Sequence, residues 1–517
     1  MTATRRRPPG DPAAPVIATG AGAVRGRTRD GVTRFRRIPY AVAPVGPLRF
    51  KAPVAHPGWS GVRDATTPGP VGQHAPDWLD TRVVRGHPLV EDPLYVNVTT
   101  PVPERGAGLP VLVWIHGGGL IFGSPNDPDD EPTATAASGV VVVSLSYRLG
   151  LEGFMPVGGG DDNRGLRDVL AALEWVAEEI EAFGGDPSRV TIAGVSAGGS
   201  LVLALLTLPA AGRLFHAAIS MSGAQECLST AAAAQASTSA FERYTGTEAS
   251  LDGLRDVSPA ELLAWSRTPA VRHQPDRALW IGVHQDGEAV PEDVVEALVA
   301  GRGAHVPAVL AFTREENAHR KWVPAASLGP ARVAWELGQV GVPAEATARY
   351  RALHPGLDDG RLVGRARAET SFHAFALRIA DARAARAGGT TWVSQFEWTG
   401  PGSGATDGVA AHGADVAHWF GNGAAAGAAP GSVSGRMQGS LRGFLHRRDP
   451  GWAPYAPPDR VVRRWDDPVR DEHDPLADLR AFWAGRDITC HWAAPVDTDR
   501  VEVRPGGTRE PSTGGRP

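Results

Sequence analysis

The stretch FGGDPSRVTIAGVSAGG, residues 183–199, decides the fold of this chain. A glycine-rich turn leads into an apolar, β-branched run (190–193), and Ser196 then stands between Gly194 and Gly198. A serine between two small residues at the end of a strand is typical of a nucleophile elbow. In this sharp strand-to-helix turn the hydroxyl is lifted above the edge of the sheet. The alternative is a glycine-rich loop with an incidental serine, because such a short motif also occurs by chance.

The regions on either side favour the elbow. After it, residues 200–212 are rich in alanine and leucine and predict a buried helix. Residues 163–184 carry apolar side chains at helical spacing and end at a glycine, so they predict a second helix. Four more apolar runs besides 188–196 predict buried strands, at 109–119, 139–149, 305–317 and 390–398.

Alternation of strands and helices predicts an α/β fold with a large, mostly parallel central sheet. Helical patterns dominate 225–300 and 325–385, which we expect to be insertions over the sheet. The Gly/Ala-rich segment 402–435 predicts a long loop passing over the site. We expect one domain over residues 15–502, between disordered tails at 1–14 and 503–517.

Composition excludes several classes of protein. The 517 residues carry a net charge of −5, which gives no electrostatic case for binding nucleic acid. Two cysteines are too few for a disulfide framework. The start of the chain lacks the apolar part of a signal peptide, and no run of about 18 apolar residues predicts a membrane span. We therefore expect a cytoplasmic protein without a membrane partner.

The run WIHGGG (114–119) ends a predicted strand with three glycines, upstream of the serine. Backbone N–H groups at this place, together with that of Ala197, could stabilise an oxyanion. A phosphate-binding loop is the alternative. It is disfavoured because the run lacks both the Lys-Ser/Thr ending and the G-x-G-x-x-G spacing.

A nucleophilic serine needs a base and an orienting acid, in the order serine, acid, histidine in this type of fold. The strand-like run at 305–317 offers Glu315 and Glu316. Spacing does not choose among the histidines that follow, although His412 and His418 lie in a glycine-rich segment beyond a strand. The eight are His319, His354, His373, His412, His418, His446, His473 and His491.

Several separated segments share the order of a known family. The serine run at 183–198 resembles the serine signature of the type-B carboxylesterases, which include the cholinesterases. EDPLYVNVTTP (91–101) resembles the second signature of that family. The resemblance extends from about residue 16 to 485 and includes GAVRGR, FRRIPYAVAPVGPLRFKAP, SYRLGLEGF, NRGLRDVLAALEWV, AAISMSGA and LRGFLHRRDPGWAPY.

The resemblance implies an α/β-hydrolase fold and a catalytic triad. Ser196 would be the nucleophile. Glu316, the second residue of its acidic pair, would be the acid, and His412 in the run AHGAD would be the base. Gly118 and Gly119 would join Ala197 as donors of the oxyanion hole. The candidates for the substrate pocket are Trp114, Phe122, Val195, His418 and Trp419. For the aromatic residues among them, a role in the core is the alternative.

The sequence also departs from the family. Val195 stands where a glutamate usually precedes the serine, which removes a buried carboxylate near the histidine. His418 stands where an aromatic residue is usual. The other departures are Asn317 for a glycine, Pro93 and Val71 for the cysteines of an early disulfide, and Ala417 for a proline.

The function expected from the resemblance is that of a serine carboxylic-ester hydrolase with an acyl-enzyme intermediate and a small-molecule ester substrate. It implies no metal and no cofactor, and leaves open whether the protein is a monomer or a homodimer. Two alternatives are an acyltransferase or tailoring enzyme of secondary metabolism on the same fold, and a non-catalytic cholinesterase-like binding protein. The intact triad positions argue against the second alternative.

Overall fold

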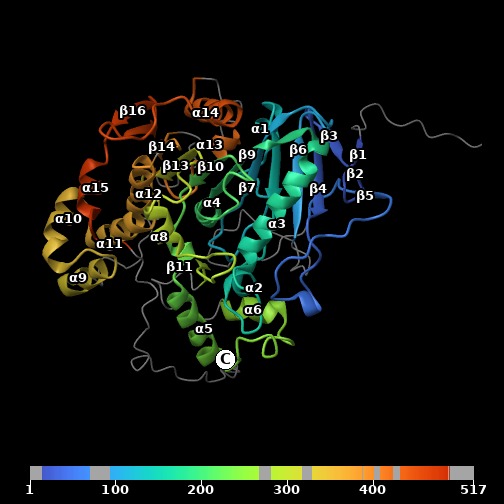
Figure 1. Cartoon of the computed structure of the whole chain (residues 1–517). Coiled ribbons are helices and arrows are strands. Elements are labelled where there is room, and N and C mark those ends of the chain that lie inside the picture. Colours follow the sequence, from blue (N-terminus) through green and yellow to red (C-terminus); the bar gives the residue numbers. More distant parts are fainter. Residues whose placement is uncertain are drawn as a thin grey trace, which may run out of the picture.

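The computed structural model describes residues 14–69, 94–266, 281–316, 329–386, 388–400, 408–422, 431–486 and 488. One large sheet of eleven strands spans the molecule (Figure 1). In sheet order its strands are β16 (Arg470–His473), β15 (Val461–Trp465), β14 (Thr391–Phe396), β13 (Ala308–Thr313), β10 (Ala217–Met221), β9 (Gly185–Val195), β7 (Leu109–Ile115), β8 (Val141–Leu145), β6 (Tyr95–Thr100), β4 (Val32–Pro39) and β3 (Arg27–Arg29).

The strands from β15 to β8 are all parallel, whereas antiparallel pairs lie at the two ends of the sheet. The predicted mostly parallel α/β sheet is therefore confirmed. All five strands expected from the sequence are present, as β7, β8, β9, β13 and β14. A separate small sheet is formed by β1 (Val16–Ala18), β2 (Ala23–Arg25) and β5 (Val62–Asp64).

Side-chain alternation along the strands divides the core between the two faces of the sheet. On β7, Val113 and Ile115 contact one apolar cluster, and Leu112 and Trp114 contact the other. Successive side chains of a strand point to opposite faces, so a central parallel strand must be apolar on both. The first cluster includes α3 (Arg164–Glu179), α4 (Ala197–Thr207) and α12 (Ala374–Ala384), and the second includes α13 (Val416–Phe420) and α14 (Val433–Arg447).

The helices expected on either side of the serine are also present. α3 ends at Glu179 and passes through a 3-10 turn, η2 (Ile180–Phe183), to Gly184 at φ 87°. α4 begins directly after Ser196 and is buried along its whole length. The prediction of a continuous loop over 402–435 is wrong for the described part of that segment, because it contains α13 and the start of α14. Non-local packing of apolar side chains of these two helices against the sheet stabilises them there.

The two helical insertions are confirmed. The first contains α5 (Ala231–Thr245), α6 (Pro259–Ser266) and α8 (Val294–Val299). It also contains a short parallel pair that was not expected, β11 (Leu228–Ser229) with β12 (Val283–His284). The second contains α9 (Pro330–Gly338), α10 (Thr347–Leu353), α11 (Asp359–Ala368), the π-helical turn η6 (Glu369–His373) and α12.

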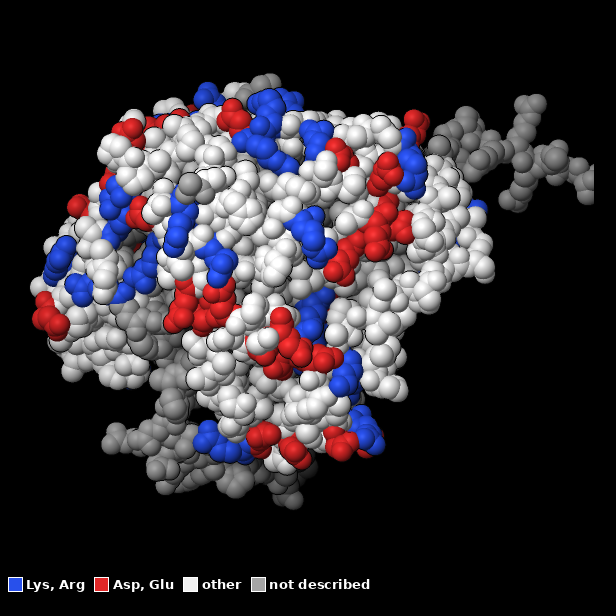
Figure 2. Space-filling view, in the orientation of Figure 1, with Lys and Arg blue, Asp and Glu red and all other residues white. Residues whose placement is uncertain are grey.

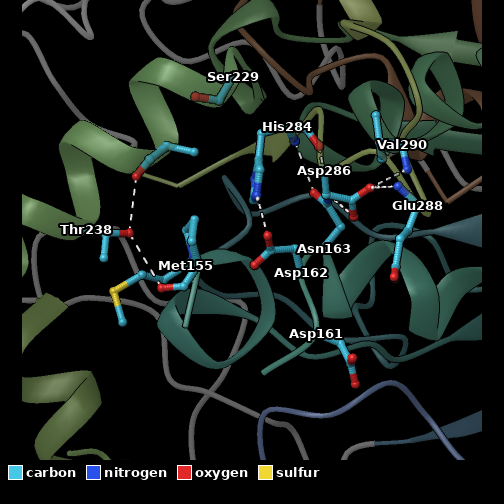
Figure 3. Close-up of polar contacts among 12 residues, drawn as sticks. Met155, Asp161, Asp162, Asn163, Ser229, Thr238, His284, Asp286, Glu288 and Val290 are labelled. Carbon is cyan, nitrogen blue, oxygen red and sulfur yellow. Dashed lines mark hydrogen bonds and ion pairs between the residues drawn. The ribbon is translucent and has the colours of Figure 1, made fainter. Parts of the chain in front are cut away.

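A buried polar cluster ties the first insertion to the start of α3 (Figure 3). The Asn163 side chain donates to the His284 carbonyl and to Asp286 Oδ2, both at 2.8 Å, and accepts from the His284 N–H at 3.0 Å. His284 Nε2 lies 3.6 Å from Asp162 Oδ2. Asn163 has a φ of 51°, a left-handed conformation that asparagine tolerates better than most residues. The cluster therefore holds this part of the insertion against the start of α3.

Figure 2 shows acidic and basic side chains interspersed on one face of the described structure. No described helix has both the length and the apolar character that crossing a bilayer would require. Of the residues discussed from sequence, Val71, Pro93, Asn317, His319 and His491 lie outside the described residues, as do Cys490, one of the two cysteines, and both tails except residue 14.

Candidate active site

Ser196 lies in a strained turn between β9 and α4. Its backbone has φ 56° and ψ −123°, and its N–H donates to the Met221 carbonyl at 2.8 Å. The two flanking glycines are required by space. A Cβ on Gly198 would lie 2.1 Å from the Ile115 carbonyl oxygen, and one on Gly194 would lie 2.5 Å from the backbone of Gly198. This is the geometry of a nucleophile elbow.

Backbone strain recurs at the ends of β10 and β13, the next two strands on one side of β9. Ser222, directly after β10, has φ 47°, and Glu316, three residues after β13, has φ 39°. Residues other than glycine are costly in this region and persist only where their surroundings hold them, commonly at functional sites. Here hydrogen bonds hold them: the Ser222 hydroxyl donates to Glu316 Oε1 at 2.8 Å, and the Thr313 N–H donates to the same oxygen at 2.7 Å.

Glu316 and His412 form a hydrogen-bonded pair. Glu316 Oε2 lies 2.5 Å from His412 Nδ1, and the His412 N–H donates to the Glu316 carbonyl at 3.1 Å. The carboxylate is fully buried, whereas 18% of the histidine side chain is exposed. Burial alone would raise the pKa of Glu316, but the imidazole and its hydrogen bond outweigh burial and lower it. An ionised Glu316 accepts from Nδ1–H and leaves Nε2 of a neutral His412 as a proton acceptor.

No direct hydrogen bond between Ser196 Oγ and His412 is present among the described residues. Hydrogen bonds of this kind are often long before a substrate binds and shorten only in the complex. The backbone nevertheless brings the groups to one sheet edge, since Ser196, Ser222 and Glu316 follow β9, β10 and β13, which are neighbours in the sheet.

The glycine run after β7 lies against the elbow. A Cβ on Gly117 would be 3.3 Å from Ser196 Cβ, and Gly118 and Gly119 have φ values of 108° and 61°. Within the described residues, the N–H groups of Gly118, Gly119 and Ala197 make no hydrogen bond to other backbone carbonyls. These three donors are therefore available to a negatively charged oxygen.

His116 supports this loop as a neutral ring. Burial lowers the pKa of its imidazole to about 4. The ring stacks on Tyr147 at a centroid distance of 4.6 Å, and the Tyr147 hydroxyl donates to the His116 carbonyl at 3.0 Å. The loop is thus held by packing and hydrogen bonds rather than by charge.

The other member of the acidic pair points elsewhere. Glu315 accepts from Arg365 at 2.5 Å and from Arg314 at 3.3 Å. The pKa of Glu315 is lowered: burial would raise it, but the two guanidinium groups outweigh burial. Of the two glutamates, Glu316 is therefore the one that the structure brings to His412.

The five candidates for the substrate pocket divide into buried and half-buried residues. Trp114, His418 and Trp419 are at most 2% exposed and pack in the core. His418 stacks on Phe396 at 5.4 Å, and its Nδ1 lies 2.6 Å from the Ser434 hydroxyl. Phe122 and Val195 are half-buried, so only these two of the five present appreciable surface near the elbow.

Three more residues at the site were not identified from the sequence. Ser222 bonds to Glu316, the Phe372 ring lies 5.0 Å from the His412 ring, and Glu226 is electrostatically coupled to both members of the pair. The sequence offers a signal for Ser222, because this residue follows an apolar, strand-like run and so lies at a strand end. The other two come from separate turns and are brought in by tertiary packing. Among the described residues, no group of three or more side chains is arranged to hold a metal ion.

Comparison with known proteins agrees with this geometry. Residues 13–324 match the carboxylesterase family. The chain is 39% identical over 309 residues to para-nitrobenzyl esterase of Bacillus subtilis (strain 168), covering 58% of this chain and 63% of that protein. It is 33% identical over 383 residues to phenmedipham hydrolase of Pseudarthrobacter oxydans, covering 72% of this chain and 76% of that protein.

A solved structure extends the likeness to the whole fold. A carboxylesterase of Geobacillus stearothermophilus superposes with a TM-score of 0.79 at 30% identity, covering 90% of this chain and 99% of the other. The family match ends before His412, whereas the superposition covers most of the chain. The fold is accordingly the α/β-hydrolase fold, and the chain belongs to the carboxylesterase family.

Proposed function

We propose that this protein is a serine carboxylic-ester hydrolase that acts through Ser196, His412 and Glu316. The observation that carries the proposal is the Glu316–His412 hydrogen bond at the sheet edge where Ser196 occupies a strained elbow. Two of the relatives are named para-nitrobenzyl esterase and phenmedipham hydrolase, which supports hydrolysis as the reaction.

In the proposed mechanism, Ser196 Oγ attacks the ester carbonyl carbon while His412 Nε2 accepts the hydroxyl proton. Glu316 holds the imidazole in the required tautomer and stabilises the imidazolium that forms. The carbonyl oxygen becomes an oxyanion and accepts hydrogen bonds from Gly118, Gly119 and Ala197, each worth roughly 3 kcal/mol.

The tetrahedral intermediate then collapses, and His412 gives its proton to the departing alcohol. An acyl-enzyme remains on Ser196. Water attacks that acyl group with His412 again accepting the proton, and a second collapse releases the carboxylic acid and restores the serine. Every step uses residues of this chain and water.

A fluorophosphonate probe tests the assignment. It should add one adduct to the peptide that contains Ser196 and none to Ser196→Ala. Hydrolysis of nitrophenyl esters of increasing acyl length would then establish the ester preference. Adding a second alcohol separates hydrolysis from acyl transfer, since a transferase would form the new ester at the expense of the free acid. Labelling that persists in Ser196→Ala would refute the proposal.

A further inference from the structure

Glu226 is a half-buried residue with a buried carboxyl oxygen, and the mechanism above has no role for it. It lies in η3 (Gln225–Cys227), four residues beyond Ser222, whose hydroxyl donates to Glu316. η3 packs against η6, the turn that contains Ser371 and Phe372. The Phe372 ring lies 5.0 Å from the His412 ring. Two short turns from different parts of the chain therefore bring Glu226 into the neighbourhood of the base.

One oxygen of this carboxyl group lacks a partner. Glu226 Oε2 is buried and accepts no hydrogen bond among the described residues. A buried carboxylate oxygen without a donor is costly, so its retention calls for a compensating interaction. Burial raises the pKa of Glu226 and the nearby Glu316 charge adds to this, while the Ser371 hydroxyl and His412 oppose it.

The coupling between Glu226 and His412 is reciprocal. If the histidine cation favours the glutamate anion, the anion favours the cation to the same extent. Two other carboxyl groups are coupled to His412, those of Glu316 and Asp415, and burial raises the pKa of Asp415 to about 6. η6 adds His373 and Glu369, which interact with each other.

The residue next to the proposed nucleophile carries no negative charge in this chain. Val195, directly before Ser196, is apolar and packs against the second core cluster. Outside the triad, the carboxyl groups coupled to His412 are those of Asp415, on the same segment as the histidine, and of Glu226, on η3.

We propose that Glu226 is a positioning residue for His412, a carboxylate outside the triad that stabilises the imidazolium formed when Ser196 transfers its proton. This inference rests on the proposed function, since it assigns Glu226 a part in the same acyl transfer. Glu226 does not touch the ester and acts only through the histidine.

The test compares Glu226→Gln with a matched control, Glu315→Gln. Glu315 is also a partly buried glutamate near the triad, but it pairs with Arg365 and Arg314. For each variant, the rate of inactivation by a fluorophosphonate is measured from pH 5 to 9. This rate uses the same nucleophile and base as ester hydrolysis, and it does not depend on finding the ester. Hydrolysis of nitrophenyl acetate provides kcat and KM.

In Glu226→Gln, the acid limb of the inactivation profile should move to lower pH, because the protonated form of the base loses a stabilising anion. The plateau rate and kcat should fall roughly 3- to 10-fold with KM unchanged within about twofold, as expected for loss of an interaction made in the transition state. Glu315→Gln should leave the limb in place.

Glu226→Leu is a second variant in case Glu226→Gln does not fold, because leucine removes the unpartnered oxygen as well as the charge. It should move the acid limb in the same direction. The inference would be overturned if the acid limb stayed in place in both variants. It would also be overturned if kcat fell together with a rise in KM and without any movement of the limb. Failure of the proposed function is distinguishable, because the wild-type protein itself would then escape labelling at Ser196.

Discussion

Glu316 Oε2 lies 2.5 Å from His412 Nδ1, while the neighbouring Glu315 turns to Arg365. We expect Glu316→Gln to lower kcat by about 10³- to 10⁴-fold, because an amide does not fix the required tautomer or stabilise the imidazolium. Glu315→Gln should lower kcat by less than about threefold. Steady-state hydrolysis of a nitrophenyl ester measures both, and a larger loss at Glu315 would contradict the assignment.

The strained backbone of Ser196 predicts a difference between two inactive variants. At φ 56° and ψ −123°, alanine keeps the strain that serine bears, whereas glycine relieves it. Ser196→Gly should therefore be more stable than Ser196→Ala by about 1 kcal/mol, after allowing for the greater entropy of glycine in the unfolded chain. Urea unfolding of the two proteins measures this, and a less stable glycine variant would argue against strain at the elbow.

The two histidines of the 408–422 segment should behave differently when truncated. His412→Ala removes the proton acceptor and should lower kcat by several orders of magnitude with little effect on folding. His418→Ala instead leaves a hole among Phe396, Trp398 and Ser434, and should lower the free energy of unfolding by about 2–4 kcal/mol. If His418→Ala were as stable as wild type but inactive, the roles would have to be exchanged.

His116 predicts how stability depends on pH. Its pKa is about 4 in the folded protein and about 6.5 when unfolded. The unfolded chain thus binds the additional proton first, and stability is lost as pH falls from about 6.5 to 4. Between pH 7 and 4.5, the unfolding free energy of wild type should fall by roughly 2 kcal/mol more than that of His116→Gln. Equal slopes would contradict a neutral, buried His116.

The strands and long helices could be predicted because each is encoded within its own segment. β7, β8, β9, β13 and β14 are short apolar runs, and α3 carries one apolar face. Glycines mark the elbow because a side chain there would collide with the backbone of Ile115. These signals are local and do not depend on contacts between distant segments of the chain.

The remaining features depend on contacts between distant segments. The helix α13 lies in a segment whose Gly/Ala-rich composition predicts a loop. Its residues Trp419 and Phe420 pack in the core. Proximity in sequence makes Trp114 and Trp419 candidates for the substrate pocket, but both side chains are buried in the core. Glu226 lies near the site because η3 packs against η6. No spacing in the sequence predicts that contact.

Backbone amides join the three strand ends that carry the site. The Ser196 N–H donates to Met221, and the Ser222 N–H donates to Ala311 at 2.7 Å. Both bonds lie inside the sheet, with β7 on one side and β14 on the other. Such protons exchange with solvent deuterium only when the central sheet opens as a whole. The elbow should consequently be among the last parts of the molecule to loosen on heating.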